Sequence, residues 1–139
     1  MAYWLMKSEP AVYSWDRLVK DKRAAWDGVK NYQAANNLRA MQIGDEAFFY
    51  HSNAGLAIVG IMKIVKTAYP DPSDSTGKFV MVDIAPVRAL KRPVTLQEIK
   101  TDKLLGHMAI VRQMRLSVSP VTKGEWGRVF QLEKAPSAL

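Results

Sequence analysis

The amino-acid sequence predicts an α+β domain built on a small curled sheet. Stretches of β-branched or alternating apolar residues recur along the chain, and helix-capping signals fall between and around them. The 139 residues fit one domain, and no regular alternation of strands and helices runs along them. A closed or half-closed barrel of five to six mostly antiparallel strands with flanking short helices is therefore favoured over a parallel, doubly wound sheet.

Five stretches have the composition of strands. They span residues 3–6, 47–50, 56–69, 79–90 and 116–118. The second follows a Gly-Asp turn signal at 44–45 and the third follows an Asn-Ala-Gly segment at 53–55, so we expect these two strands to form a hairpin. Pro86 requires an edge position or a bulge in the fourth strand, because proline cannot donate to the ladder. The short first and last strands would lie at the two ends of the sheet.

Four capping signals predict short helices. Ser14 precedes residues 15–22, Asn31 precedes residues 32–41, and capping boxes begin at Thr95 and Thr122. The last helix carries Trp126, Val129 and Phe130 at the spacing of one helical face, so this stripe should pack on the sheet. Residues 69–77 have loop composition throughout. We expect a single domain over residues 2–133 and a frayed tail over 134–139.

Composition limits the chemistry that the chain can perform. It has no cysteine and only two histidines, which excludes disulfides, thiolate metal sites and a cysteine nucleophile. We therefore expect no metal and no cofactor. No apolar run is long enough to cross a membrane, and the first ten residues lack a signal-peptide pattern. The expected compartment is the cytoplasm with access to the nucleoid, or the nucleus in a eukaryote.

Charge gives the first positive indication of a partner. Twenty Lys and Arg residues oppose thirteen Asp and Glu residues, for a net charge of +7 and a pI near 9.7. Such a balance favours a polyanion such as nucleic acid, although a soluble basic protein without one has the same composition. Seven basic residues lie between positions 86 and 115, where only Glu98 and Asp102 oppose them.

Signals for catalysis are missing. The sequence has no Gly-rich phosphate loop, no GxSxG and no HExxH. His51 and Ser52 are adjacent in a predicted strand, so their side chains point to opposite faces and do not easily share a proton. We therefore predict that the protein is not an enzyme.

Aromatic residues beside polar ones indicate a binding site. Trp26 stands in a Gly-containing segment between two predicted helices, where a core tryptophan is less usual. Its ring is predicted to stack on a planar ligand, with Gly28 allowing a close backbone approach. The alternative is that Trp26 plugs one end of the barrel. Trp4 and Trp126 lie in periodic apolar contexts and are predicted to be core residues.

Five blocks of the chain resemble those of the EVE domain family, in the same order. They are YWLMKSEP, WDGVKNYQAANNLRAM, GDEAFFYHSN, IVGIMKIVKTAYPDP and RLSVSPVTKGEW, and together they span almost the whole chain. The resemblance implies a PUA-like fold, a curved β-barrel with flanking helices that is distantly related to the YTH domain, a reader of N6-methyladenine in RNA. It also implies a non-catalytic reader of modified bases in nucleic acid.

The resemblance assigns the parts of a base pocket. Trp26 would be the aromatic wall on which a flipped base stacks, and Lys7 and Ser8 would face the edge of that base. The other implied pocket residues are Gly28, Val29 and Asn31 for the floor, Ser52 and Asn53 at the mouth, and Tyr69 and Pro70 for the opposite wall.

The same resemblance points to three phosphate contacts. Lys30 keeps the charge where many relatives carry Arg, but it lacks the bidentate fork of arginine. Arg112 and Arg115 come just before the block that resembles the last strand of the family. They would hold phosphates and position the nucleic-acid strand while the pocket reads the base.

The predicted function is therefore a module that binds a methylated or hydroxymethylated base, flipped out of single-stranded or paired DNA or RNA. Two alternatives remain open at this point. One is a PUA-type RNA-binding module without selectivity for modified bases. The other is a small enzyme or nucleotide-metabolite binder that uses the same pocket.

Overall fold

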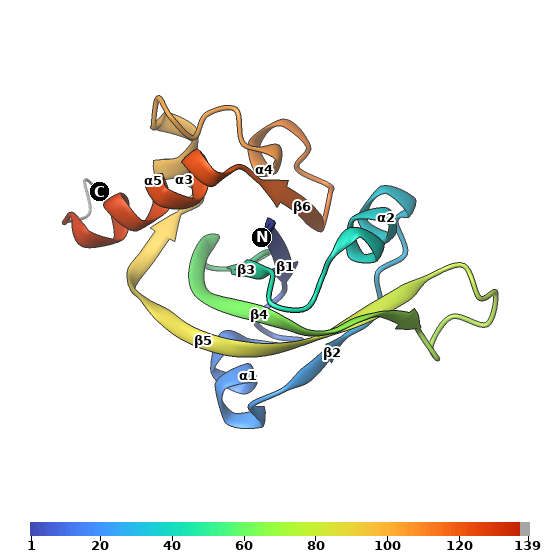
Figure 1. Ribbon diagram of the computed structural model, residues 1–139. Helices are drawn as coiled ribbons and strands as arrows, with labels where there is room; N and C mark the ends of the chain where they lie inside the picture. The colour runs from blue at the N-terminus through green and yellow to red at the C-terminus, as the bar shows by residue number, and fades with distance from the viewer. Residues whose placement is uncertain (137–139) are drawn as a thin grey trace.

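The computed structural model describes residues 1–136, which form a six-stranded mixed sheet flanked by short helices (Figure 1). The strands are β1 (Tyr3–Ser8), β2 (Ala24–Trp26), β3 (Glu46–His51), β4 (Ala57–Pro70), β5 (Val80–Thr95) and β6 (Val118–Val121). Their order across the sheet is β2-β5-β4-β3-β1-β6. Among the strand pairs of residues 1–136, only β1–β3 is parallel. The α+β class is confirmed, and the curved sheet stays open because β2 and β6 form two separate edges.

The position of β1 differs from the prediction. This strand lies inside the sheet, between β3 and β6, and not at one end. Its residues Trp4, Leu5 and Met6 are all buried, as a strand covered on both faces requires. The edge beyond β5 is taken instead by β2, a three-residue strand whose Trp26 pairs with Val82.

The long hairpin of β4 and β5 forms the curved floor of the sheet (Figure 1). Pro86 lies inside this sheet, and the register between the two strands shifts next to it, so the predicted bulge is confirmed. The loop predicted from residue 69 begins later, since Pro70 still pairs with Val80. Asp71 then starts the loop and accepts hydrogen bonds from the backbone and hydroxyl of Ser73, at 2.8 and 2.7 Å.

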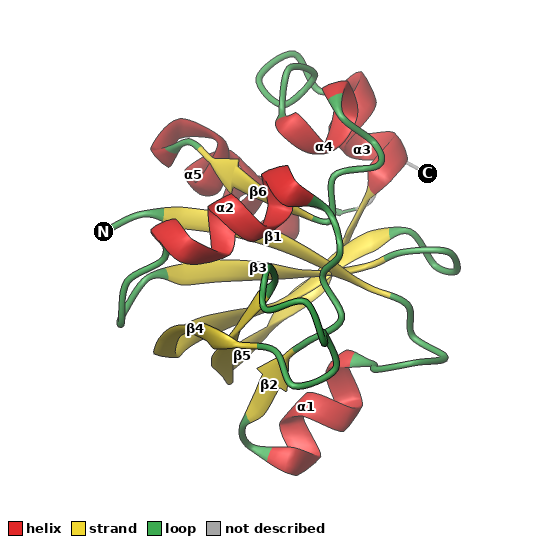
Figure 2. Cartoon of the chain, turned by 90° about the vertical axis from the view of Figure 1, so that its right-hand side faces the viewer, coloured by secondary structure: helices red, strands yellow, loops and turns green. Residues whose placement is uncertain are grey.

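The helices begin where the capping signals place them. They are α1 (Trp15–Asp21), α2 (Tyr32–Ala40), α3 (Leu96–Thr101), α4 (Ala109–Arg112) and α5 (Lys123–Lys134). Ser14 and Asn31 accept hydrogen bonds as N-caps, and both capping boxes are formed. The sequence did not predict α4, whose N-cap Met108 makes no side-chain capping bond. α1 lies below the sheet and α3, α4 and α5 lie above it (Figures 1 and 2).

The sheet carries an apolar core on each face. Alternate residues of neighbouring strands separate, so Leu5 and Phe48 pack on one face while Met6 and Phe49 pack on the other. Trp126 of α5 stacks on Phe48 with ring centroids 3.9 Å apart and is buried, as predicted. Trp4, the other predicted core tryptophan, is buried as well.

Part of the predicted C-terminal tail, over residues 134–136, belongs to α5 or directly follows it. Lys134 belongs to α5, and the carbonyl of Ala135 accepts a 2.7 Å hydrogen bond from Nε of Arg92. The tail predicted from residue 134 therefore does not begin there, and its last three residues, 137–139, lie outside the described residues.

Candidate functional site

A cavity of about 530 Å³ lies where β1 and β2 end, and we name it the Trp26 pocket. Its lining residues are Lys7, Ser8, Glu9, Val12, Tyr13, Ala25, Trp26 and Asp27. The predicted aromatic wall and the predicted polar pair after the first strand therefore line one cavity. They meet because β1 and β2 end on the same side of the domain, although β2 was not itself predicted.

A second cavity, the central pocket, adjoins the first. Its volume is about 420 Å³, and it shares Lys7 and Glu9 with the Trp26 pocket. Ser52 and Asn53, which the resemblance places at the mouth, line this second cavity and not the first. Arg115 also lines it, together with the exposed apolar side chains of Leu56 and Met114.

Trp26 belongs to the core, which was one of the two interpretations left open by the sequence. It is the last residue of β2, and only 8% of it is exposed. Its ring meets the edge of Phe49 at a centroid distance of 5.5 Å. Trp26 packs in the core and also lines the pocket. The two predicted roles, stacking wall and core plug, therefore do not exclude each other.

Hydrogen bonds fix the polar wall of the Trp26 pocket. The hydroxyl of Ser8 donates to the carbonyl of Tyr13 at 2.6 Å, and the hydroxyl of Tyr13 donates to Asp21 at 2.9 Å. Burial and the bond to Asp21 raise the pKa of Tyr13 to about 12, so this phenol stays neutral. On the other side, Nζ of Lys7 donates to the carbonyl of Met114 at 2.6 Å, and burial lowers the pKa of Lys7.

The predicted floor residues have structural roles outside the two pockets. Gly28 has a φ of +76° and donates its N–H to buried Asp71 at 2.8 Å, which ties this segment to the loop after β4. Val29 is buried in the core, and Asn31 caps α2. None of Gly28, Val29 and Asn31 is among the residues that line either pocket.

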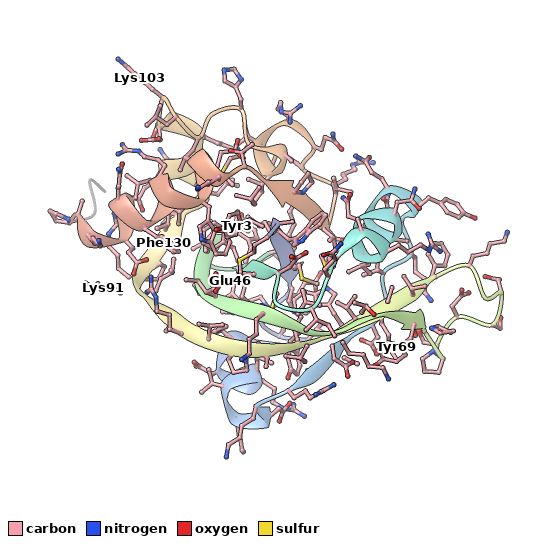
Figure 3. All side chains as sticks on the ribbon, viewed as in Figure 1. Tyr3, Glu46, Tyr69, Lys91, Lys103 and Phe130 are labelled. Atoms are coloured by element: carbon pink, nitrogen blue, oxygen red, sulfur yellow. The ribbon has the colours of Figure 1, made fainter. Side chains whose placement is uncertain are left out.

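Tyr69 and Pro70, the predicted opposite wall, are not among the residues that line the Trp26 pocket. Trp26 pairs with Val82 and Tyr69 pairs with Met81, and consecutive residues of a strand point to opposite faces. The hydroxyl of Tyr69 donates to the carboxylate of Asp83, which raises the pKa of Tyr69 to about 12. Both residues lie at the C-terminal end of β4. Tyr69 is labelled in Figure 3. Val12 and Tyr13 line the Trp26 pocket instead.

The three predicted phosphate contacts have different surroundings. Of these three residues, Arg115 lines the central pocket, whereas Lys30 and Arg112 line neither of the two pockets described above. Nζ of Lys30 lies 5.5 Å above the ring of Phe79, and Nε of Arg112 donates to the carbonyl of His107 at 2.7 Å.

The basic stretch between positions 86 and 115 is partly structural. Arg88 binds Glu133 at 2.7 Å and Arg92 binds Glu98 at 2.8 Å, and both carboxylates are buried. These ion pairs hold α5 and α3 to β5, so two of the seven basic residues in this stretch are neutralised within the fold.

His51 supports the pocket from behind. Its Nε2 accepts the backbone N–H of Trp15 at 3.1 Å, which fixes the start of α1 next to Tyr13. An imidazole that accepts at Nε2 is neutral, and burial lowers the pKa of His51 in the folded protein.

We therefore expect the free energy of unfolding to fall as the pH drops below the ordinary histidine pKa of 6.5. The unfolded chain binds a proton there before the folded chain does, so stability rises with pH across this window. Urea unfolding at about pH 7.5 and about pH 5 measures the change. In His51→Gln the amide oxygen can accept the same bond without titrating, so the part of the slope due to His51 should vanish. An unchanged slope in this variant contradicts the assignment.

Within residues 1–136, no helix is long and apolar enough to cross a membrane. In the same part of the chain, no three His, Asp or Glu side chains gather in a way that would hold a metal ion.

Known proteins are similar to this chain in sequence and in architecture. Thymocyte nuclear protein 1 from Mus musculus is 43% identical over 95% of this chain and 74% of its own length. The NMR structure of Rpa0253 from Rhodopseudomonas palustris is 50% identical, with a TM-score of 0.91 over 96% of this chain and 94% of that one. A crystal structure of human THYN1 protein in complex with DNA containing 5-methylcytosine is 40% identical, with a TM-score of 0.90 over 99% and 100% of the two chains.

A more distant structure has the same fold. The YTH domain of Zygosaccharomyces rouxii MRB1, solved with N6-methyladenosine RNA, is 13% identical and has a TM-score of 0.59 over 99% of this chain and 87% of its own. The expected distant relationship to YTH domains is thus confirmed at the level of fold. The EVE domain family matches residues 2–132, and the chain belongs to that family.

Proposed function

We propose that the protein is a non-catalytic reader of methylated DNA, which takes 5-methylcytosine into the Trp26 pocket. One observation carries the proposal. The chain has an aromatic-walled cavity beside a half-buried lysine, and it is 40% identical along its length to a human protein whose structure holds DNA with 5-methylcytosine. To reach DNA, the protein would be located in a cytoplasm with access to the nucleoid, or in the nucleus if the organism is a eukaryote.

The cavity suits a flat base with an apolar substituent. Trp26 and Val12 supply apolar surface, and Ser8, Lys7 and Asp27 supply polar groups for the base edge. Burying one added methyl group returns about 0.8 kcal/mol, which corresponds to about fourfold in affinity. Flipping a base out of a duplex costs a few kcal/mol, so single strands and weakened pairs should bind more tightly than an intact duplex.

The hydrogen bonds around the pocket favour binding over catalysis. A hydrolase needs a nucleophile within reach of a free base. His51 cannot serve as that base, because its Nε2 already accepts the backbone N–H of Trp15. The Ser8 hydroxyl donates to a carbonyl and has no basic partner among residues 1–136. We therefore include the absence of catalysis in the proposal.

The test compares matched oligonucleotides. We expect a single-stranded DNA with one 5-methylcytosine to bind about fourfold or more tightly than the same strand with cytosine. Fluorescence anisotropy with DNA and RNA versions of one sequence, across modified bases, measures this ratio. Arg115→Ala serves as the control, because losing a phosphate contact should weaken both strands equally and preserve the ratio.

Three results would contradict the reader function. Equal affinity for modified and unmodified strands in both DNA and RNA would favour a plain RNA-binding module. Chemical turnover of the oligonucleotide would indicate an enzyme. Affinity for a free nucleoside equal to that for an oligonucleotide would indicate a metabolite binder.

A further inference from the structure

We propose that the central pocket is a second nucleotide subsite, which holds the nucleotide next to the modified one. This inference rests on the proposed function of the Trp26 pocket. Lys7 and Glu9 line both cavities, so the two cavities adjoin at these two residues. A strand that inserts one base into the Trp26 pocket therefore carries its next nucleotide over the central pocket.

Lys7 is placed for the phosphate that joins the two nucleotides. The residue is only partly exposed, and its Nζ donates to one neutral partner, the carbonyl of Met114 at 2.6 Å. No salt bridge within residues 1–136 includes Lys7 or Arg115. An ammonium has three N–H donors, so Lys7 keeps donors and an uncompensated charge for an anion between the two pockets.

The rim of the central pocket offers a platform for a base. The side chains of Leu56 and Met114 are large and apolar, yet 43% and 55% exposed. The apolar face of a nucleobase can be buried against such side chains, and the flexible thioether of methionine adapts to different rings. Ser52 and Asn53 border the same cavity and present polar groups to a base edge.

One charge opposes this arrangement. Glu9 lines both pockets as Lys7 does, but it is exposed, so water and salt screen its carboxylate. Arg115, which lines the central pocket only, adds a second positive charge there. The balance at the central pocket therefore favours an anionic strand, and Glu9→Gln should tighten binding about two- to threefold at low salt.

The experiment builds the ligand one group at a time. We measure affinities for 5-methyl-2′-deoxycytidine, for its 5′- and 3′-phosphates, and for dinucleotides with a neighbour on either side. A version with an abasic neighbour keeps the phosphate and removes the second base. We expect the phosphate on one side to strengthen binding about tenfold. The second base on that side should add at least about fivefold more.

Variants separate the two contributions. Met114→Ala and Leu56→Ala should remove the gain from the second base and leave the abasic ligand unaffected, with Leu104→Ala as the exposed apolar control. Lys7→Gln should remove the gain from the phosphate and reduce the log–log salt slope by about 0.7. Lys103→Gln is its control, since Lys103 lies in the exposed loop after α3 and lines neither pocket (Figure 3).

The outcomes distinguish this subsite from the reader function. Selective binding of the methylated nucleoside with no gain from either neighbour overturns the subsite and leaves the reader function standing. A gain from the neighbour that persists in both Met114→Ala and Leu56→Ala also overturns it. A gain that these variants abolish, without any preference for the methylated base, supports the subsite and overturns the reader function.

Discussion

Trp26→Ala should lower the free energy of unfolding and abolish methyl selectivity together. Removing a buried tryptophan costs about 3–5 kcal/mol, because it loses both transfer energy and packing. Trp26 is 8% exposed, and it meets Phe49 edge to face. Trp26 and Tyr13 are the two aromatic residues that line the Trp26 pocket. Losing the ring of Trp26 should therefore also weaken binding by about 1–3 kcal/mol.

A second variant separates the two effects. Trp26→Phe keeps an aromatic face and much of the volume, so it should lose less stability than Trp26→Ala and retain a measurable preference for 5-methylcytosine. Thermal unfolding gives the stability of each variant, and binding to methylated and unmethylated strands is then measured below the lower of the two melting temperatures. Full selectivity in a folded Trp26→Ala protein would show that Trp26 is a core residue alone.

This coupling follows from the packing under the pocket. Phe49 meets both Trp26 and Trp15 edge to face, with ring centroids 5.5 and 5.6 Å away. His51 lies edge-on to the same ring at 5.6 Å. The wall of the pocket is thus one face of the core, and rigid packing behind it keeps the pocket open before a ligand arrives.

The sequence predicted the local features of the fold better than the long-range ones. Ser14, Asn31 and Thr122 are recognisable because a cap bonds a backbone N–H only three residues away. β2 depends instead on pairing Trp26 with Val82, and three residues carry too little periodicity to reveal a strand. The parallel placement of β1 against β3 is equally non-local.

The candidate site shows the same division. The resemblance assigned Lys7, Ser8 and Trp26 to one pocket, and all three line the Trp26 pocket. It could not predict the register of the strands. The pairing of β4 with β5 contains four register shifts, and each of them changes which residues oppose one another. The face of the sheet on which the side chain of Tyr69 lies was therefore not predictable. Val12 and Met114 were missed because a single apolar residue in a loop has no signal in a sequence.

Gly60→Ala tests how tightly α1 is held behind the pocket. A Cβ at Gly60 would lie 2.6 Å from three ring atoms of Trp15, a distance that such atoms do not adopt. The ring is buried and already contacts Phe49, so it cannot move away freely. We expect a loss of about 1–3 kcal/mol in the free energy of unfolding, measured by urea denaturation.

Two controls make this prediction specific. A Cβ at Gly127, inside α5, meets nothing within 4 Å, so Gly127→Ala should stabilise the protein by up to about 1 kcal/mol through helix propensity. In a Trp15→Phe background the smaller ring leaves room for the added methyl, so Gly60→Ala should cost less there than in the wild type. Equal costs in the two backgrounds would show that the clash with Trp15 is not the cause.

Because Trp15 begins α1 directly after Tyr13 and Ser14, a displaced ring should also shift the Tyr13 wall and weaken binding of the methylated strand in the still-folded variant.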